Sequence, residues 1–349
     1  MPHGCLPLSS KALSRAWISS RPSKVWLFRN CGYASSGICL AQRGPGVPLP
    51  VRKEPVRGSN LSTNPTRLVR LDLLMERSSG SVEIAIGLID GPVAIDHPDL
   101  AGGRIRVAGT SNAACNMSGS IACQHGTFVA GILVARRSSS APAICPGCTL
   151  LVRPIFPERS STSGDMPSAT PRELAQAVRE SIAAGARVIN LSAALFNPDA
   201  AGVRQLQGAL DFAAARNVIT VAAAGNQASI GSSVITRHPW VIPVAGCDQR
   251  GHPMSESNFG FSIGQRGLRA PAEDITSLGT YGDSRSFGGT SAAAPFVTGT
   301  IALLWSAFPS ATATQVKLAL LQAGAVRRGS IVPPLLDAQA AYHAMAAIQ

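Results

Sequence analysis

The stretch that decides the fold is Ile84-Ala85-Ile86-Gly87-Leu88-Ile89, which Asp90 follows directly. Six consecutive residues without a polar side chain are typical of a parallel strand that is buried on both faces. Comparable apolar runs recur at residues 150–155, 188–191, 218–223 and 241–245. We therefore expect a sheet of buried, mostly parallel strands.

The segments between these strands carry helix signals. Thr170-Pro171-Arg172-Glu173 combines a capping threonine, a proline at the first helical position and a glutamate at the third, which predicts a helix to about residue 184. Further helices are expected at residues 202–216, 291–308 and, from a cap at Thr312, to about 324. This alternation predicts an α/β fold with a mostly parallel central sheet covered by helices.

The positive charge is concentrated at the start of the chain. The net charge is +12 over 349 residues, but residues 1–80 hold 12 Lys and Arg against 3 acids, and the remainder holds 19 against 16. A basic segment can bind nucleic acid, but no aromatic interleaving or RNA-binding motif accompanies this one. We expect residues 1–66 to be a basic, disordered segment and expect no nucleic-acid partner.

The sequence shows no membrane span, because no apolar run approaches roughly 20 residues. Residues 16–28 are interrupted by Ser, Arg, Pro and Lys and do not resemble a secretion signal, which favours a cytoplasmic location. Hydrophobic residues make up 45% of the chain and charged residues 14%, so residues 67–349 can bury a large core as one domain.

Four polar residues follow buried strands or open helices. They are Asp90, His125 before Gly126-Thr127-Phe128, Asn226 after Ala224-Gly225, and Ser291 within Gly289-Thr290-Ser291-Ala292. Singly, each is explained by a turn, a helix cap or a satisfied polar side chain. Jointly, Asp90, His125 and Ser291 stand in the chain order Asp, His, Ser, which resembles the order of the catalytic triad in proteases of the subtilisin type.

The chemistry of acyl transfer requires these residue types. Ser291 becomes a nucleophile when His125 takes its proton, and Asp90 fixes the imidazole tautomer. The backbone N–H of Ser291, at the positive end of a helix, and the amide of Asn226 would form the oxyanion hole.

Several motifs together resemble the active-site motifs of the subtilisin-like (S8) serine peptidases. The resemblance covers about residues 80–324 and rests on residues 89–90 with 97–100, 123–131, 188–192, 224–226 and 289–295. It implies a subtilisin-like three-layer fold and serine endopeptidase activity on a peptide or protein. Because the chemistry of the triad needs no metal or cofactor, we expect none. The resemblance also implies that the substrate is bound by Asn190, Leu191, Ser192, Ala193, Ala194, Ala224 and Gly225.

The sequence departs from the family at several positions. Gly91 and Pro92 follow Asp90 where many relatives carry a hydroxyl residue and then glycine, so other donors must hold the carboxylate. Asp99 matches a calcium ligand of many relatives, but Arg136 and Arg137 follow the histidine segment, and we expect no calcium there. Phe128 replaces a histidine that is common in the family but lies outside the triad.

A closer resemblance is to the cyanobactin (patellamide) maturation proteases. It rests on Asp90-Gly91-Pro92-Val93, Cys145-Pro146-Gly147-Cys148 and Pro154-Ile155-Phe156. The resemblance implies that the substrate is a ribosomally made precursor peptide. The competing hypothesis is a catalytically silent scaffold of the same fold that only binds peptides.

The cysteines allow three interpretations. Free thiols are favoured for a reducing cytoplasm, disulfides come next, and a zinc site is the third. The residues that could form a disulfide or a zinc site are Cys115, Cys123, Cys145 and Cys148. Cys123 lies two residues before His125, so its oxidation state bears on the site.

Overall fold

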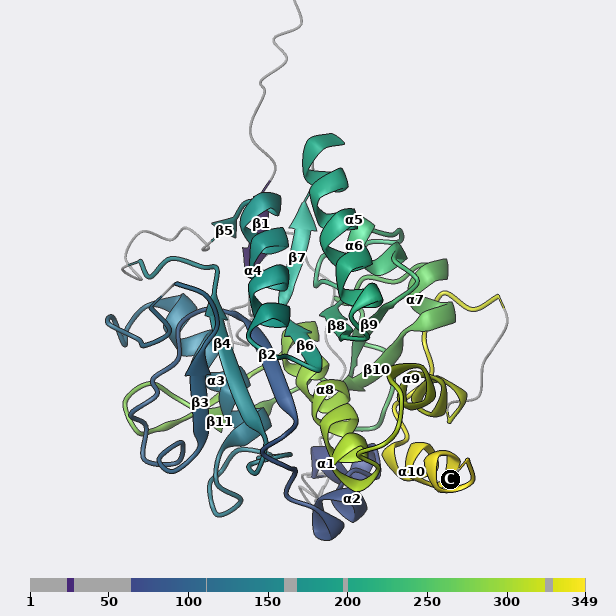
Figure 1. Cartoon of the computed structure of the whole chain (residues 1–349), viewed down its shortest axis with the longest axis horizontal. Helices are drawn as coiled ribbons and strands as arrows, with labels where there is room; N and C mark the ends of the chain where they lie inside the picture. Colours follow the sequence, from purple (N-terminus) through teal and green to yellow (C-terminus); the bar gives the residue numbers. More distant parts are fainter. Residues whose placement is uncertain are drawn as a thin grey trace, which may run out of the picture.

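The centre of the molecule is a seven-stranded parallel sheet (Figure 1). The computed structural model describes residues 24–27, 64–110, 112–159, 168–196, 200–323 and 329–348. The strand order is β10-β9-β8-β6-β2-β4-β3, and every neighbouring pair is parallel. The strands are β2 Ala85–Asp90, β3 Arg104–Val107, β4 Thr149–Pro154, β6 Val188–Leu191, β8 Ile219–Ala223, β9 Val241–Cys247 and β10 Leu268–Pro271.

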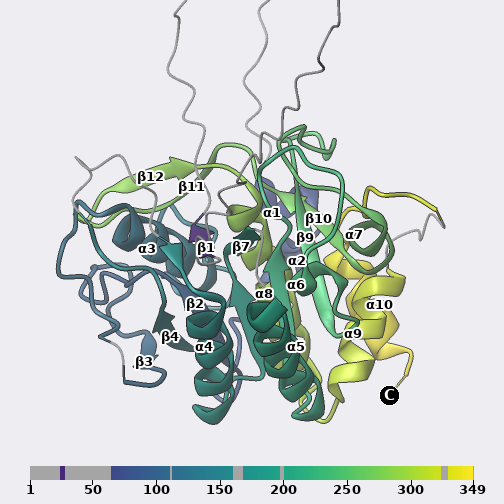
Figure 2. The same ribbon diagram turned by 90° about the horizontal axis from the view of Figure 1, so that it is seen from above.

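Helices cover both faces of this sheet, which confirms the predicted three-layer α/β fold (Figures 1 and 2). Consecutive strand residues alternate between two apolar clusters, with Leu88 in one and Ile89 in the other. The first cluster joins the sheet to α3 (Ile121–Val134) and α8 (Thr290–Ala307). The second joins it to α4 (Pro171–Ala183) and α5 (Ala200–Ala215).

Shorter elements complete the described chain. Residues of α2, α9 and α10 add to the first cluster and residues of α6 to the second. The remaining helices are α1 Pro65–Leu68, α2 Asp72–Arg77, α6 Val234–Arg237, α7 Phe261–Arg266, α9 Ala313–Gln322 and α10 Ala338–Ala346. Two small antiparallel sheets contain β1 Lys24–Leu27, β5 Ser168–Ala169 and β7 Ala193–Phe196, and β11 Ile275–Leu278 and β12 Ser284–Phe287.

The five predicted strands are all present, with bounds within two residues of those expected. Strands β3 and β10 were not predicted. β3 is an edge strand whose residues are mostly exposed, and β10 has only four residues with Arg269 as the second, so neither contains a run of three consecutive large apolar residues such as the one that opens residues 150–155. The predicted capping box at Thr170 is confirmed, with Glu173 as its partner.

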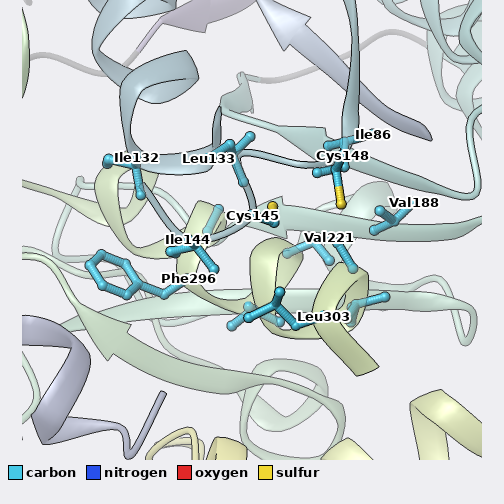
Figure 3. Packing of buried hydrophobic residues seen from close by; sticks show 14 of the residues in the cluster. Ile86, Ile132, Leu133, Ile144, Cys145, Cys148, Val188, Val221, Phe296 and Leu303 are labelled. Carbon is cyan, nitrogen blue, oxygen red and sulfur yellow. The ribbon is translucent and has the colours of Figure 1, made fainter. Parts of the chain in front are cut away.

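The core around α8 is tightly packed and includes two cysteines. Figure 3 shows Cys145 and Cys148 among Ile86, Ile144 and Leu303, between the sheet and α8.

In the described part of the chain, no helix is long and apolar enough to cross a membrane.

Most of the basic N-terminal segment lies outside the described residues. Within it, Lys24–Leu27 form strand β1, which the expectation of disorder did not foresee. The boundary near residue 66 stays a prediction.

Candidate active site

Asp90, His125 and Ser291 lie in one hydrogen-bonded row. His125 Nδ1 is 2.7 Å from Asp90 Oδ1, and His125 Nε2 is 2.9 Å from Ser291 Oγ. All three residues are at most 3% exposed. An ionised carboxylate can only accept, so the neutral imidazole donates from Nδ1, and Nε2 is left to accept the Ser291 proton.

Three elements bring these side chains together. Asp90 is the last residue of β2, a strand between β4 and β6 in the sheet. His125 lies on α3 and Ser291 in the first turn of α8, and both helices pack on the same face of the sheet. Helix α3 begins at Ile121, where Ser120 caps it, so His125 lies within the helix and not at its start.

Two glycines allow α3 to approach the loop after Asp90. A Cβ on Gly91 would lie 2.0 Å from the carbonyl oxygen of Ala122, and a Cβ on Gly126 would lie 2.4 Å from that of Pro92. No side chain fits at either position without a backbone shift. The close contact between α3 and this loop therefore explains why position 91 is a glycine and not the hydroxyl residue of many relatives.

The Asp90 carboxylate is held through one oxygen. Its Oδ1 accepts from the backbone N–H of Gly91 at 2.7 Å, besides the bond with His125. Its Oδ2 is buried and has no partner among the described residues. The donor expected in place of a hydroxyl side chain is therefore the backbone N–H of Gly91.

Asn226 presents its amide N–H2 group without a partner. Asn226 Oδ1 accepts from the N–H of Thr290 at 2.9 Å, while Nδ2 is buried and unpartnered within the described chain. Gly289 has φ of +101°, and a Cβ there would lie 2.5 Å from Nδ2. Thr290 Oγ1 accepts in turn from the Gly225 N–H. The Asn226 side-chain amide can therefore donate next to the start of α8, which is where an oxyanion hole needs a donor.

The predicted substrate-binding residues divide into two groups. Asn190, Leu191 and Ser192 are fully buried, and Asn190 bonds both Ser192 Oγ, at 2.8 Å, and Thr298 Oγ1 of α8, at 2.9 Å. All three residues are covered in this structure, main chain included, so none of their side chains lines an open groove. The other predicted residues belong to β7 and to the turn after β8, namely Ala193, Ala194, Ala224 and Gly225.

Sequence reasoning missed Asn258, which fixes the turn containing Asn226. Its Oδ1 accepts from the backbone N–H groups of Gln227 and Ser229 at 3.0 and 3.1 Å, and its Nδ2 donates to the carbonyl of Ala224 at 3.1 Å. Asn258 lies 34 residues after Ala224 in an irregular loop. Its local sequence carries no signal for this role.

The cysteines are only partly as expected. Cys115 and Cys123 form a disulfide, so the preferred free-thiol interpretation was wrong for this pair. Cys145, Cys148 and Cys247 are free and buried, and burial raises the pKa of the Cys247 thiol to about 12. Because two of the four cysteines are bonded to each other and the other two lie in the core, the four do not assemble as a zinc site.

Arg136, which follows α3, contacts the loop that contains Asp99. The N–H of Arg136 donates to the carbonyl of Asp99 at 2.9 Å, and its guanidinium bonds the carbonyl of Pro98. A cation at this loop would lie near a fixed positive charge. The expectation that no calcium binds there stays a prediction.

Comparisons with known proteins agree in family. The model of the subtilase family of peptidases matches residues 81–334. The chain is 30% identical to subtilisin DY of Bacillus licheniformis over 72% of its own length and 86% of that protein. It is also 30% identical to the thermostable alkaline protease of Halalkalibacterium halodurans, over 66% of this chain and 59% of that protein.

Solved structures give the same picture. A mutant of the protease domain of PatA, 30% identical, superposes with a TM-score of 0.69 over 77% of this chain and 98% of that one. The prenylagaramide maturation protease PagA, 26% identical, superposes with a TM-score of 0.68 over 79% and 98%.

Proposed function

This chain belongs to the subtilase family and is a subtilisin-like serine endopeptidase. We propose that it cleaves a ribosomally made precursor peptide through Asp90, His125 and Ser291. The observation that carries the catalytic part is the buried row from Asp90 Oδ1 through both imidazole nitrogens to Ser291 Oγ. Each bond lies within the range that a nucleophile and its base require.

The residues act in sequence. His125 Nε2 takes the proton of Ser291 as Oγ attacks the scissile carbonyl, and the imidazolium is stabilised by Asp90. The developing oxyanion accepts hydrogen bonds from Asn226 Nδ2 and from the backbone N–H of Ser291, which belongs to the first turn of α8 and so has no acceptor within the helix. The imidazolium then gives its proton to the leaving amine. Water, activated by the same histidine, hydrolyses the acyl-enzyme.

A fluorophosphonate probe tests this assignment against the silent peptide-binding scaffold. We expect the purified protein to be labelled at Ser291 and the Ser291→Ala variant to remain unlabelled. The variant should lose about 10⁶-fold in kcat on a peptide substrate. Its melting temperature should hardly change, because Gly289, and not Ser291, is the N-cap of α8. An unlabelled wild-type protein that still binds peptides would support the scaffold.

Two features support a precursor peptide as the substrate. The chain is similar to the patellamide maturation protease PatA, at 31% identity, and to the prenylagaramide maturation protease PagA. The main chain of β7, which pairs with β1 in this structure, can recognise an extended strand through main-chain hydrogen bonds. Selective cleavage of one bond needs such differential binding in the transition state.

The substrate proposal is tested by a side-by-side digest of casein and of candidate precursors encoded near the gene. We expect one dominant cut in a precursor and slow degradation of casein. Rapid, unselective digestion of casein would refute the maturation role and leave the serine peptidase assignment intact.

Cleavage inside the producing cell is part of this proposal, and fractionation of that cell measures where the protein is located. The disulfide argues for checking this location, because such bonds are more common in oxidising compartments.

A further inference from the structure

A carboxylate lies against the disulfide that joins the start of α3 to the loop before it. One oxygen of Glu158 and the sulfur atoms of Cys115 and Cys123 all lie within 4.8 Å of one another. Within the described ranges of the chain, this is the one group of His, Cys, Asp or Glu side chains spaced closely enough to hold a metal ion. Sulfur and carboxylate oxygen are both ligands that zinc accepts in proteins.

Hydrogen bonds from the loop hold Glu158 in this position. Its Oε1 accepts from the backbone N–H groups of Asn116 and Met117, at 2.9 and 2.7 Å, and its Oε2 accepts from Asn116 Nδ2 at 3.1 Å. A carboxylate has about four lone-pair sites, so these three hydrogens leave one site for a metal. Donors that fix a carboxylate in this way orient it as partners outside the ligand set orient a metal ligand.

The spacing of the two cysteines suits a tetrahedral cation as well as a disulfide. Their Cα atoms are 5.6 Å apart. Two sulfurs that are each about 2.3 Å from a tetrahedral zinc lie about 3.8 Å from each other. Cysteine side chains on backbone atoms this close can reach that separation by rotation once the S–S bond is open. With Glu158 as the third ligand, the fourth position is left for water.

The disulfide must first be reduced, and one of its ends is accessible. Cys115 is half-buried, whereas Cys123 is fully buried. A dithiol reductant attacks the disulfide, gives it two electrons and two protons, and leaves as a cyclic disulfide, so that two protein thiols remain. Binding of a divalent cation then releases both thiol protons to the solvent.

We propose that the reduced pair Cys115 and Cys123, together with the carboxylate of Glu158, binds one Zn²⁺ or a similarly thiophilic divalent cation. Two thiolates select such a cation over Ca²⁺ or Mg²⁺. The cation takes no part in the chemistry of the triad. It joins the same two segments as the disulfide, namely α3, which carries His125, and the loop whose Cys115 N–H donates to the carbonyl of Val93. The proposal does not depend on which peptide the enzyme cleaves.

The test uses the full-length protein in its oxidised and reduced forms. The protein is reduced with a dithiol, freed from it by gel filtration without oxygen, and titrated with Zn²⁺ in a calorimeter. We expect the reduced wild-type chain to bind one more Zn²⁺ than the reduced Cys115→Ser/Cys123→Ser variant, which keeps the other six of the eight cysteines. The oxidised wild-type chain should lack this additional site. Titration with Co²⁺ should give a thiolate-to-metal charge-transfer band that the double variant lacks.

Two glutamate variants test the carboxylate. Glu158→Gln keeps a side-chain oxygen that can accept from the loop but replaces a charged ligand by a neutral one. We expect its affinity for Zn²⁺ in the reduced form to fall at least about tenfold. Glu83→Gln, a change at an exposed carboxylate outside the group, should bind Zn²⁺ as the wild type does. Equal affinities of the two variants would show that Glu158 only positions the loop and would overturn its role as a ligand.

A stability measurement completes the test. Zn²⁺ should raise the melting temperature of the reduced wild-type protein, because it binds the folded site, and should leave that of the double variant unchanged. Equal binding of Zn²⁺ by the reduced wild type and the double variant, with no difference in the Co²⁺ spectra, would overturn the proposal.

Discussion

Buried polar atoms with few partners set the chemistry of the site. Asn226 Nδ2 and Asp90 Oδ2 are both buried and unpartnered within the described chain. An unsatisfied buried donor costs about 1–3 kcal/mol, so its persistence indicates a use. For Asn226 we propose that this use is a hydrogen bond made only when the oxyanion forms, which would lower the barrier without tightening substrate binding.

Asn226→Ala tests this at the level of one residue. We expect kcat to fall about 10²–10³-fold, as it does when subtilisin loses the equivalent amide donor, with little change in KM. Stopped-flow or initial-rate kinetics on one peptide would measure both. A comparable rise in KM at constant kcat would instead place Asn226 in ordinary substrate binding.

At the scale of elements, the site depends on how closely α3 approaches the turn after β2. Gly126→Ala would place a Cβ 2.4 Å from the carbonyl oxygen of Pro92, so the helix or the turn must shift. We expect a loss of about 1–3 kcal/mol in the free energy of unfolding. We also expect at least a 10²-fold drop in kcat/KM, because the His125–Asp90 bond spans these two elements.

Gly208→Ala is the matched control. Gly208 lies in α5, where a Cβ would meet only Arg179 Nη2 at 3.6 Å, an ordinary contact. This change should leave kcat/KM unchanged and stabilise the helix by up to about 1 kcal/mol. Equal effects of the two substitutions in denaturant titrations and kinetics would contradict the role of the close contact.

The disulfide attaches the start of α3 to the segment before it. Cys123 lies in the first turn of α3, and the N–H of Cys115 donates to the carbonyl of Val93, three residues after Asp90. The Cys115→Ser/Cys123→Ser variant should lose about 2–3 kcal/mol of stability, the entropy expected for closing so short a loop. Thermal melts should show the same loss in the wild-type protein under a dithiol reductant and none in the variant. If the reductant also shifted the variant, another thiol would be responsible.

For the whole molecule, the parallel sheet brings distant segments to one edge. His125 and Ser291 are 166 residues apart, yet they meet because α3 and α8 cover the same face of the sheet. The same packing buries charged groups far from the site. Lys317 of α9 is buried, donates to the carbonyl of Pro239 at 2.5 Å and lies over the ring of Trp240.

Lys317 gives the molecule a pH-dependent stability. Burial, with the nearby charge of Arg266, lowers the pKa of Lys317 to about 8, below its ordinary value of 10.5. Between these two values the unfolded state binds more protons than the folded state, so the free energy of unfolding rises with pH. The contribution is at most about 1.4 kcal/mol per pH unit. Denaturant titrations from pH 7.5 to 10 should show it in the wild-type protein relative to Lys317→Met. A difference between the two proteins that does not change with pH would refute it.

The sequence by itself determined most of the local structure and the candidates for the catalytic residues. Runs such as residues 84–89 and 188–191 indicated buried strands, because a strand that is buried on both faces needs apolar side chains at consecutive positions. The cap at Thr170 was readable for the same reason. The order of Asp90, His125 and Ser291 could be compared with a known family without any knowledge of distances.

Only the tertiary structure decided which distant groups meet. The pairing of Cys115 with Cys123, the turn held by Asn258 and the buried side chain of Asn190 all depend on packing between segments. The pairing of β1 with β7 is of the same kind, because four residues of ordinary strand propensity find their partners nearly 170 residues later. A contact of this range is fixed by the arrangement of the whole sheet and its helices, and no local pattern encodes it.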